Sequence, residues 1–166
     1  MTEPALGAFG VTATNGWKAW VIRAVTRSTV NHAFVAVGNG RIIEANPFGA
    51  DLGWVGEYPH AIWSDAPPDG KGPAVAAAAI RLKGTPYSWI DDACIGLADV
   101  FGWHVPEPVR KRLTRRTRLM CSQLVDTAYR DAGLELFHDG RIAGDVSPGD
   151  LLDVILAEKK VGHGAA

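Results

Sequence analysis

Three side chains in this sequence could together perform nucleophilic chemistry on a carbonyl group: the thiol of Cys121, the imidazole of His32 and the carboxylate of Glu44. A cysteine attacks as its thiolate, and a neighbouring histidine can accept its proton and later donate it to a leaving group. A carboxylate that accepts one ring N–H fixes the tautomer and direction of that histidine. The three residue types therefore indicate acyl transfer through a covalent thioester, provided that the fold brings them together.

Residues 31–45 contain the histidine and the acid, and their pattern is typical of two short strands joined by a tight turn. Because Gly40 can adopt the left-handed conformation, Gly38-Asn39-Gly40 predicts a three-residue loop. In that loop Val37 pairs with Arg41, and this pairing sets the register of the whole hairpin. A two-residue loop would place the histidine and the acid on opposite faces of the sheet, because a slip by one residue turns every side chain over.

Counted outward from the three-residue loop, Phe34 faces Glu44 and His32 faces Asn46. Side chains alternate between the two faces of a sheet, so all four residues are expected on one face. The sequence therefore predicts a direct contact between the imidazole and the carboxylate. The alternative reading is a solvent-exposed histidine at a strand edge and a glutamate that caps a loop.

Residues 120–125 begin a predicted helix whose buried face carries Cys121, Leu124, Val125 and Ala128, and Gly133 is expected to end it. A cysteine in the first turn of a helix feels the positive end of the helix dipole, which favours the thiolate. The other cysteine, Cys94, is expected within a helix on an apolar face, where it would act as a small buried hydrophobic residue. The sequence thus indicates one reactive thiol.

The remaining pattern predicts mixed helices and strands. Strands are expected within 6–13 and near 52–55 and 60–63, and helices at 17–26, 73–82 and 90–100 and after a capping box at 147–150. A chain of 166 residues with net charge −1 fits one domain over residues 1–166. Two cysteines do not make a disulfide framework.

The composition and the ends of the chain bear on partners and compartment. No apolar run has the length of a membrane span, and the N-terminus lacks the pattern of a secretory signal. We therefore expect a cytoplasmic protein, with delivery by a phage or by cell lysis left open. A basic run at 110–118 is either a solvated helix face or a rim that attracts an anionic substrate, and no recognised nucleic-acid motif accompanies it.

The hairpin, the segment Gly84-Thr85-Pro86-Tyr87-Ser88-Trp89 and the segment Met120-Cys121-Ser122-Gln123-Leu124-Val125 together resemble the NlpC-type papain-like cysteine peptidases. In the standard family the tyrosine and cysteine segments precede the histidine hairpin, whereas here they follow it. This order is similar to that of the circularly permuted branch, which includes the YiiX-like and lecithin–retinol-acyltransferase-like enzymes. The chain departs from the family in the long stretch 90–119, in Met120 before the cysteine, and in Glu44 where many relatives carry a second histidine.

This resemblance implies an α+β, papain-like, circularly permuted domain, in which an antiparallel sheet packs against a helical part that carries the nucleophile. It implies Cys121 as nucleophile, His32 as base and Glu44 as the residue that orients the base. Tyr87 becomes a substrate or oxyanion contact beside the backbone N–H of the cysteine. Apart from the resemblance, we also predict that Asn46 and Ser122 contact the substrate. The implied activity is hydrolysis of an amide bond, for example in a peptidoglycan-type peptide, without a cofactor.

Three alternatives stay open at this point. The same site could transfer an acyl group from a lipid or thioester, or the scaffold could be a binding module that has lost its activity. Cys121, His32 and Glu44 could also bind zinc, although the chain contains no His-x-x-x-His or Cys-x-x-Cys spacing.

Overall fold

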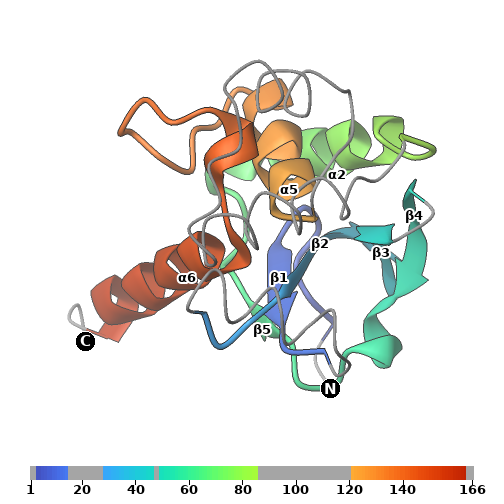
Figure 1. The fold of residues 1–166 in the computed structure, drawn as a ribbon, viewed down its shortest axis with the longest axis horizontal. Coiled ribbons are helices and arrows are strands. Elements are labelled where there is room, and N and C mark those ends of the chain that lie inside the picture. The colour runs from blue at the N-terminus through green and yellow to red at the C-terminus, as the bar shows by residue number, and fades with distance from the viewer. Residues whose placement is uncertain (1–2, 15–27, 47–48, 86–120, 164–166) are drawn as a thin grey trace, which may run out of the picture.

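The computed structural model describes residues 3–14, 28–46, 49–85 and 121–163. This part of the chain has an α+β fold built on one five-stranded antiparallel sheet with strand order β4-β3-β2-β1-β5 (Figure 1). The strands are β1 (Phe9–Thr12), β2 (His32–Gly38), β3 (Arg41–Asn46), β4 (Gly49–Trp54) and β5 (Ile62–Trp63). The α-helices are α2 (Gly72–Arg81), α5 (Cys121–Asp131) and α6 (Pro148–His163), and the short 3-10 helices are η1 (Val55–Glu57), η2 (Pro68–Gly70) and η3 (Ala143–Asp145).

The α+β class and the antiparallel sheet predicted from the sequence are confirmed. The helices expected at 17–26 and 90–100 lie outside the described residues. Strand β4 covers most of the segment expected near 52–55, and β5 forms the end of the segment expected near 60–63.

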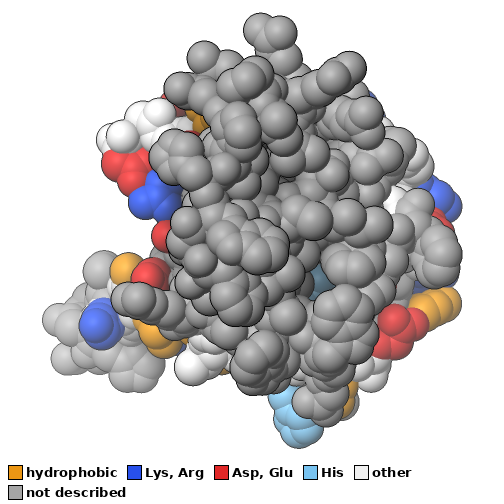
Figure 2. All heavy atoms as spheres, in the orientation of Figure 1, with side chains coloured by type: hydrophobic (Ala, Val, Ile, Leu, Met, Phe, Trp, Pro, Cys, Tyr) orange, Lys and Arg blue, Asp and Glu red, His pale blue; other side chains and the backbone are white. Residues whose placement is uncertain are grey.

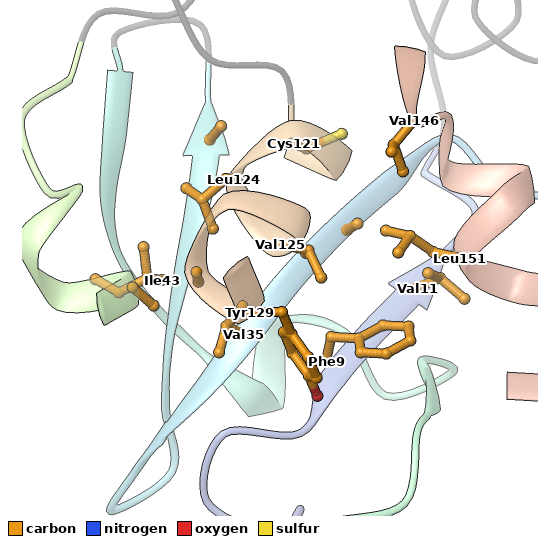
Figure 3. Packing of buried hydrophobic residues seen from close by; sticks show 14 of the residues in the cluster. Phe9, Val11, Val35, Ile43, Cys121, Leu124, Val125, Tyr129, Val146 and Leu151 are labelled. Atoms are coloured by element: carbon orange, nitrogen blue, oxygen red, sulfur yellow. The ribbon is translucent and has the colours of Figure 1, made fainter. Parts of the chain in front are cut away.

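Helices α2 and α5 pack against each other and against β2, and α6 packs against α5, β1 and β5 (Figure 1). The main hydrophobic core fills the space between these helices and the sheet (Figure 3). Its fully buried large side chains are Phe9, Val11, Val35, Ile43, Val75, Leu124, Val125, Val146, Leu151 and Ile155. The apolar face predicted for the helix that carries Cys121 is therefore the face that packs on the sheet.

The central strand β2 has two different faces. Ala33 and Val35 belong to the core beneath the helices, so the residues that alternate with them, His32 and Phe34, point to the opposite face. The sheet thus separates the hydrophobic core from a second layer in which the histidine lies.

The β2–β3 hairpin has the predicted pairing of Phe34 with Glu44, but its loop differs from the expectation. Gly38, not Val37, pairs with Arg41, so the loop contains only two residues, and the register shifts between Ala36 and Gly38. Both loop residues have positive φ, 53° at Asn39 and 67° at Gly40, as a tight type I′ turn requires. Val37 is the extra residue of a β-bulge, and this bulge restores the register that the shorter loop would otherwise lose.

The ends of the helices follow the sequence signals. Gly133, with φ 72°, ends α5, and the N–H of Leu134 donates to the carbonyl oxygen of Tyr129 at 2.9 Å, as in a Schellman motif. At the start of α6 the Asp150 carboxylate accepts from the backbone N–H of Ser147 at 2.7 Å, and the Asp150 N–H donates to the Ser147 hydroxyl at 3.2 Å. The predicted capping box is therefore present.

Replacing Leu124 with alanine should lower the free energy of unfolding by about 2–5 kcal/mol, because this fully buried side chain leaves a cavity between α5 and the sheet. The matched control is Leu156→Ala on α6, where the side chain is 44% exposed and the loss should be much smaller. Denaturant unfolding of both variants checks this, and equal losses would contradict the described core.

Candidate active site

The imidazole of His32 and the carboxylate of Glu44 are in direct contact. Nε2 of the ring lies 2.6 Å from Oε2 of the acid, and both side chains are largely buried, with 14% and 9% of their surfaces exposed. The two residues come from adjacent strands, with His32 at the first position of β2 and Glu44 near the end of β3. The contact predicted from the hairpin register is confirmed.

Glu44 has a second donor that sequence reasoning missed. The hydroxyl of Tyr58 donates to the same oxygen, Oε2, at 2.5 Å. Tyr58 follows η1, and its backbone is fixed by its N–H bond to Val55 at 3.1 Å and by its carbonyl, which accepts from Ala61 at 3.0 Å. No local motif marks this tyrosine in the sequence, because its contact depends on how the chain turns after β4.

These contacts shift the pKa values of the acid and the base in opposite directions. Burial by itself lowers the pKa of His32, but hydrogen-bond and electrostatic interactions with Cys121 and with Glu44 raise it to about 9. Burial by itself raises the pKa of Glu44, but hydrogen bonds from His32 and Tyr58 bring it below its ordinary value. At neutral pH the pair is therefore an imidazolium beside a carboxylate.

Cys121 is the first residue of α5 and carries a free thiol that is 3% exposed (Figure 3). Its Sγ lies 4.0 Å from the carbonyl oxygen of Asn31, the residue that immediately precedes the histidine. The sulfur therefore lies next to the backbone that leads into His32, and Cys121 is among the groups that raise the pKa of the His32 ring.

Asn31 holds the strand end at which these groups meet. Its side-chain Oδ1 accepts from the backbone N–H of Thr14 at 2.8 Å, and its Nδ2 donates to the Thr14 hydroxyl at 2.6 Å. Its own N–H donates to the carbonyl oxygen of Thr12 at 3.1 Å. The start of β2 is therefore fixed from both backbone and side chain, which places the His32 ring relative to α5.

Gly53 on β4 leaves the space that the Glu44 carboxylate occupies. A Cβ at this position would lie only 2.6 Å from Oε1 of Glu44 and 3.2 Å from Cγ1 of Ile42. Gly53 pairs with Ile42, so its missing side chain would project on the face that carries Glu44. The carboxylate is thus confined by a bare backbone on one side and by two hydrogen-bond donors on the other.

The structure describes two of the three predicted substrate contacts, Ser122 and Asn46. Ser122 is fully buried, and its hydroxyl donates to the carbonyl oxygen of Val146 at 2.5 Å. Its contact with substrate stays a prediction. Asn46 lies at the end of β3, paired with Gly49, and lines a shallow depression beside Lys83; its role stays a prediction.

Tyr87, Cys94 and the basic run 110–118 lie outside the described residues. Gly84 and Thr85, at the end of the preceding described segment, bond to β4: the N–H of Gly84 donates to the Ala50 carbonyl at 2.8 Å, and the Ala50 N–H donates to the Thr85 carbonyl at 2.9 Å. On the face shown in Figure 2, coloured acidic and basic side chains are visible at several separate places around the edge of the molecule. The predicted basic rim stays a prediction.

Among the residues that the structure describes, no three His, Cys, Asp or Glu side chains are grouped so as to hold a metal ion, and that includes the set of Cys121, His32 and Glu44. Within the same residues, no helix has the length and apolar character needed to cross a membrane. No known protein-family model matches the chain, and no curated protein matches it.

The raised pKa of His32 predicts a late titration. We expect the ring to lose its proton near pH 9, not near 6.5, when its carbon-bound protons are followed by NMR. Because the folded pKa exceeds the unfolded one, the stabilisation from this group is complete below about pH 6.5 and is lost as pH rises through 9.

Glu44 contributes in the other direction: its stabilisation is present above its unfolded pKa and is lost as pH falls through the lower folded value. A Glu44→Gln variant should lower the His32 midpoint, and a wild-type midpoint at or below 6.5 would contradict the described contacts.

Replacing Gly53 with alanine should displace the Glu44 carboxylate and lower the His32 pKa by about one unit, because the ion pair loses its alignment. Gly56→Ala is the matched control, since a Cβ there meets nothing within 4 Å. The same NMR titration measures both variants. An unchanged His32 pKa in Gly53→Ala would show that the close approach does not position the acid.

Proposed function

We propose that this protein is a thiol-dependent hydrolase that cleaves an amide bond with Cys121 as nucleophile, His32 as acid and base, and Glu44 as the residue that orients His32. The observation that carries the proposal is that the acid and the base meet at the strand end where the helix of Cys121 begins. The His32 ring lies 2.6 Å from the Glu44 carboxylate through Nε2, and the Cys121 sulfur lies 4.0 Å from the carbonyl oxygen of Asn31, the residue before His32. Covalent acyl transfer needs a nucleophile, a base and a group that orients the base, and Cys121, His32 and Glu44 are the residue types that supply them.

In the proposed reaction the Cys121 sulfur, having given its proton to His32, attacks the carbonyl carbon and forms a tetrahedral intermediate. The imidazolium then donates its proton to the amide nitrogen, the C–N bond breaks, and an amine leaves while a thioester remains on the sulfur. His32 next takes a proton from water as the water oxygen adds to the thioester carbon. The C–S bond breaks, and the acid product and the thiol are released. Glu44 keeps the ring aimed through both steps and stabilises its positive charge.

We also propose that the domain is a circularly permuted papain-like fold and that the cleaved bond lies in a peptide of the peptidoglycan type. Support comes from the three sequence motifs and from the order in which they occur, with the strand of His32 and the strand of Glu44 before the helix of Cys121. The antiparallel sheet packed against α5 is consistent with this assignment.

The decisive experiment is alkylation with iodoacetamide at neutral pH, with each cysteine followed by peptide mass spectrometry. Cys121 should react at least ten times faster than Cys94, and His32→Ala should slow the reaction at Cys121 by a similar factor. Replacing the ring with a methyl group can only open the way to a sulfur that is 3% exposed. A slower reaction in this variant therefore reports lost activation of the thiol and not lost access.

Glu44→Gln is the second variant, because it keeps the size of the side chain and removes its charge. It should react at a rate between those of wild type and His32→Ala, since the base remains but loses its charged partner. If both cysteines react slowly and equally, and His32→Ala has no effect, the proposed hydrolase is wrong and a binding module becomes the better account.

A further inference from the structure

We propose that Tyr58 is a positioning residue of the thiol site: its hydroxyl, by donating to Oε2 of Glu44, fixes the carboxylate in the orientation that aims His32 at the sulfur. This inference rests on the proposed function and assigns a fourth member to the same site. Neither the sequence motifs nor the expected triad includes this tyrosine.

The first observation is that the acid is held independently of the base. Oε2 accepts the Tyr58 hydroxyl at 2.5 Å and the His32 ring at 2.6 Å, whereas Oε1 lies above the bare backbone of Gly53. Rotation of the carboxylate would break both hydrogen bonds or drive an oxygen toward β4. If the ring shifts during a reaction cycle, the tyrosine therefore keeps the carboxylate in place.

The second observation is that Tyr58 is itself held in place by packing. Its ring stacks on Phe34, with centroids 4.7 Å apart and planes inclined by 23°, and its centroid lies 5.4 Å from that of the His32 ring. Phe34 is fully buried and fits against Gly10, where a Cβ would lie 2.5 Å from the phenyl ring. The hydroxyl is therefore directed by a stacked ring, so that removing the oxygen alone should leave the stack intact.

The third observation is that Tyr58 stays a donor over a wide pH range. Burial and the hydrogen bond to Glu44 both raise the pKa of its hydroxyl, so the tyrosine keeps its proton while the acid is charged. A hydrogen bond to a charged group is among the stronger kinds in proteins. Within the part of the chain that the structure describes, further charged or titratable groups that act on this pair are Asp51 on β4, Glu57 on η1 and Cys121 on α5.

The test is Tyr58→Phe, with Tyr129→Phe as the matched control. Tyr129 is also buried, and its hydroxyl donates to the carbonyl oxygen of Gly7 at 3.1 Å, far from the acid. Two readouts are needed: the titration of the Glu44 carboxyl carbon by NMR, and the pH dependence of iodoacetamide alkylation at Cys121. Thermal unfolding of both variants checks that they fold.

We expect Tyr58→Phe to raise the pKa of Glu44 by about one unit. The acid limb of the alkylation profile, the pH range in which the alkylation rate of Cys121 falls on acidification, should shift to higher pH by the same amount. Tyr129→Phe should change neither. If the pKa of Glu44 is the same in Tyr58→Phe as in wild type, the proposal is overturned. It is also overturned if the Glu44 pKa changes but the acid limb of Cys121 alkylation does not, because the tyrosine would then not act on the thiol. If wild-type Cys121 shows no alkylation that depends on His32, the proposed function fails, and the Glu44 titration still decides whether Tyr58 holds the acid.

Discussion

The hydrogen bond between the His32 ring and the Glu44 carboxylate is the interaction on which the rest of the site depends. Both groups are taken largely out of water, which is costly for charged side chains unless each compensates the other. The partners therefore have to meet within hydrogen-bond distance, and their strands have to be paired in one register. That register comes from the Phe34–Glu44 pair and is preserved by the bulge at Val37. A small irregularity near the turn thus determines whether an acid and a base share a face.

The sheet keeps two kinds of environment apart. On the face beneath α2 and α5, close-packed apolar side chains give the domain its stability, and Cys121 belongs to this layer. On the other face, the histidine lies among Phe34, Tyr58 and Glu44. At the end of the central strand, where α5 begins, the Cys121 sulfur lies 4.0 Å from the carbonyl oxygen of Asn31. This geometry places the Cys121 thiol in the core layer and the His32 ring on the opposite face of the sheet.

Sequence reasoning identified the parts of the fold and site that depend on local periodicity. Alternation in the hairpin placed His32 beside Glu44, and helical spacing placed Cys121 on the buried face of its helix. What it missed depends on the path of the chain in space. The bulge at Val37 could not be predicted, because the same residues are compatible with a two-residue and with a three-residue loop. Tyr58 contacts Glu44 because η1 turns the chain back after β4. The burial of Ser122 likewise depends on the path of the chain, because its hydroxyl donates to Val146, the residue that follows η3.

The central claim is that the sulfur of Cys121 and the ring of His32 lie close enough to act on one carbonyl group. A short bifunctional alkylating reagent such as 1,3-dibromoacetone measures this directly, because it can join a sulfur and a ring nitrogen only when both are within its reach. The account predicts an intramolecular link between the peptides that contain Cys121 and His32, detected by mass spectrometry, and its loss in a variant that lacks either residue. Single alkylation of Cys121 without a link to His32, or a link to another side chain, would contradict it.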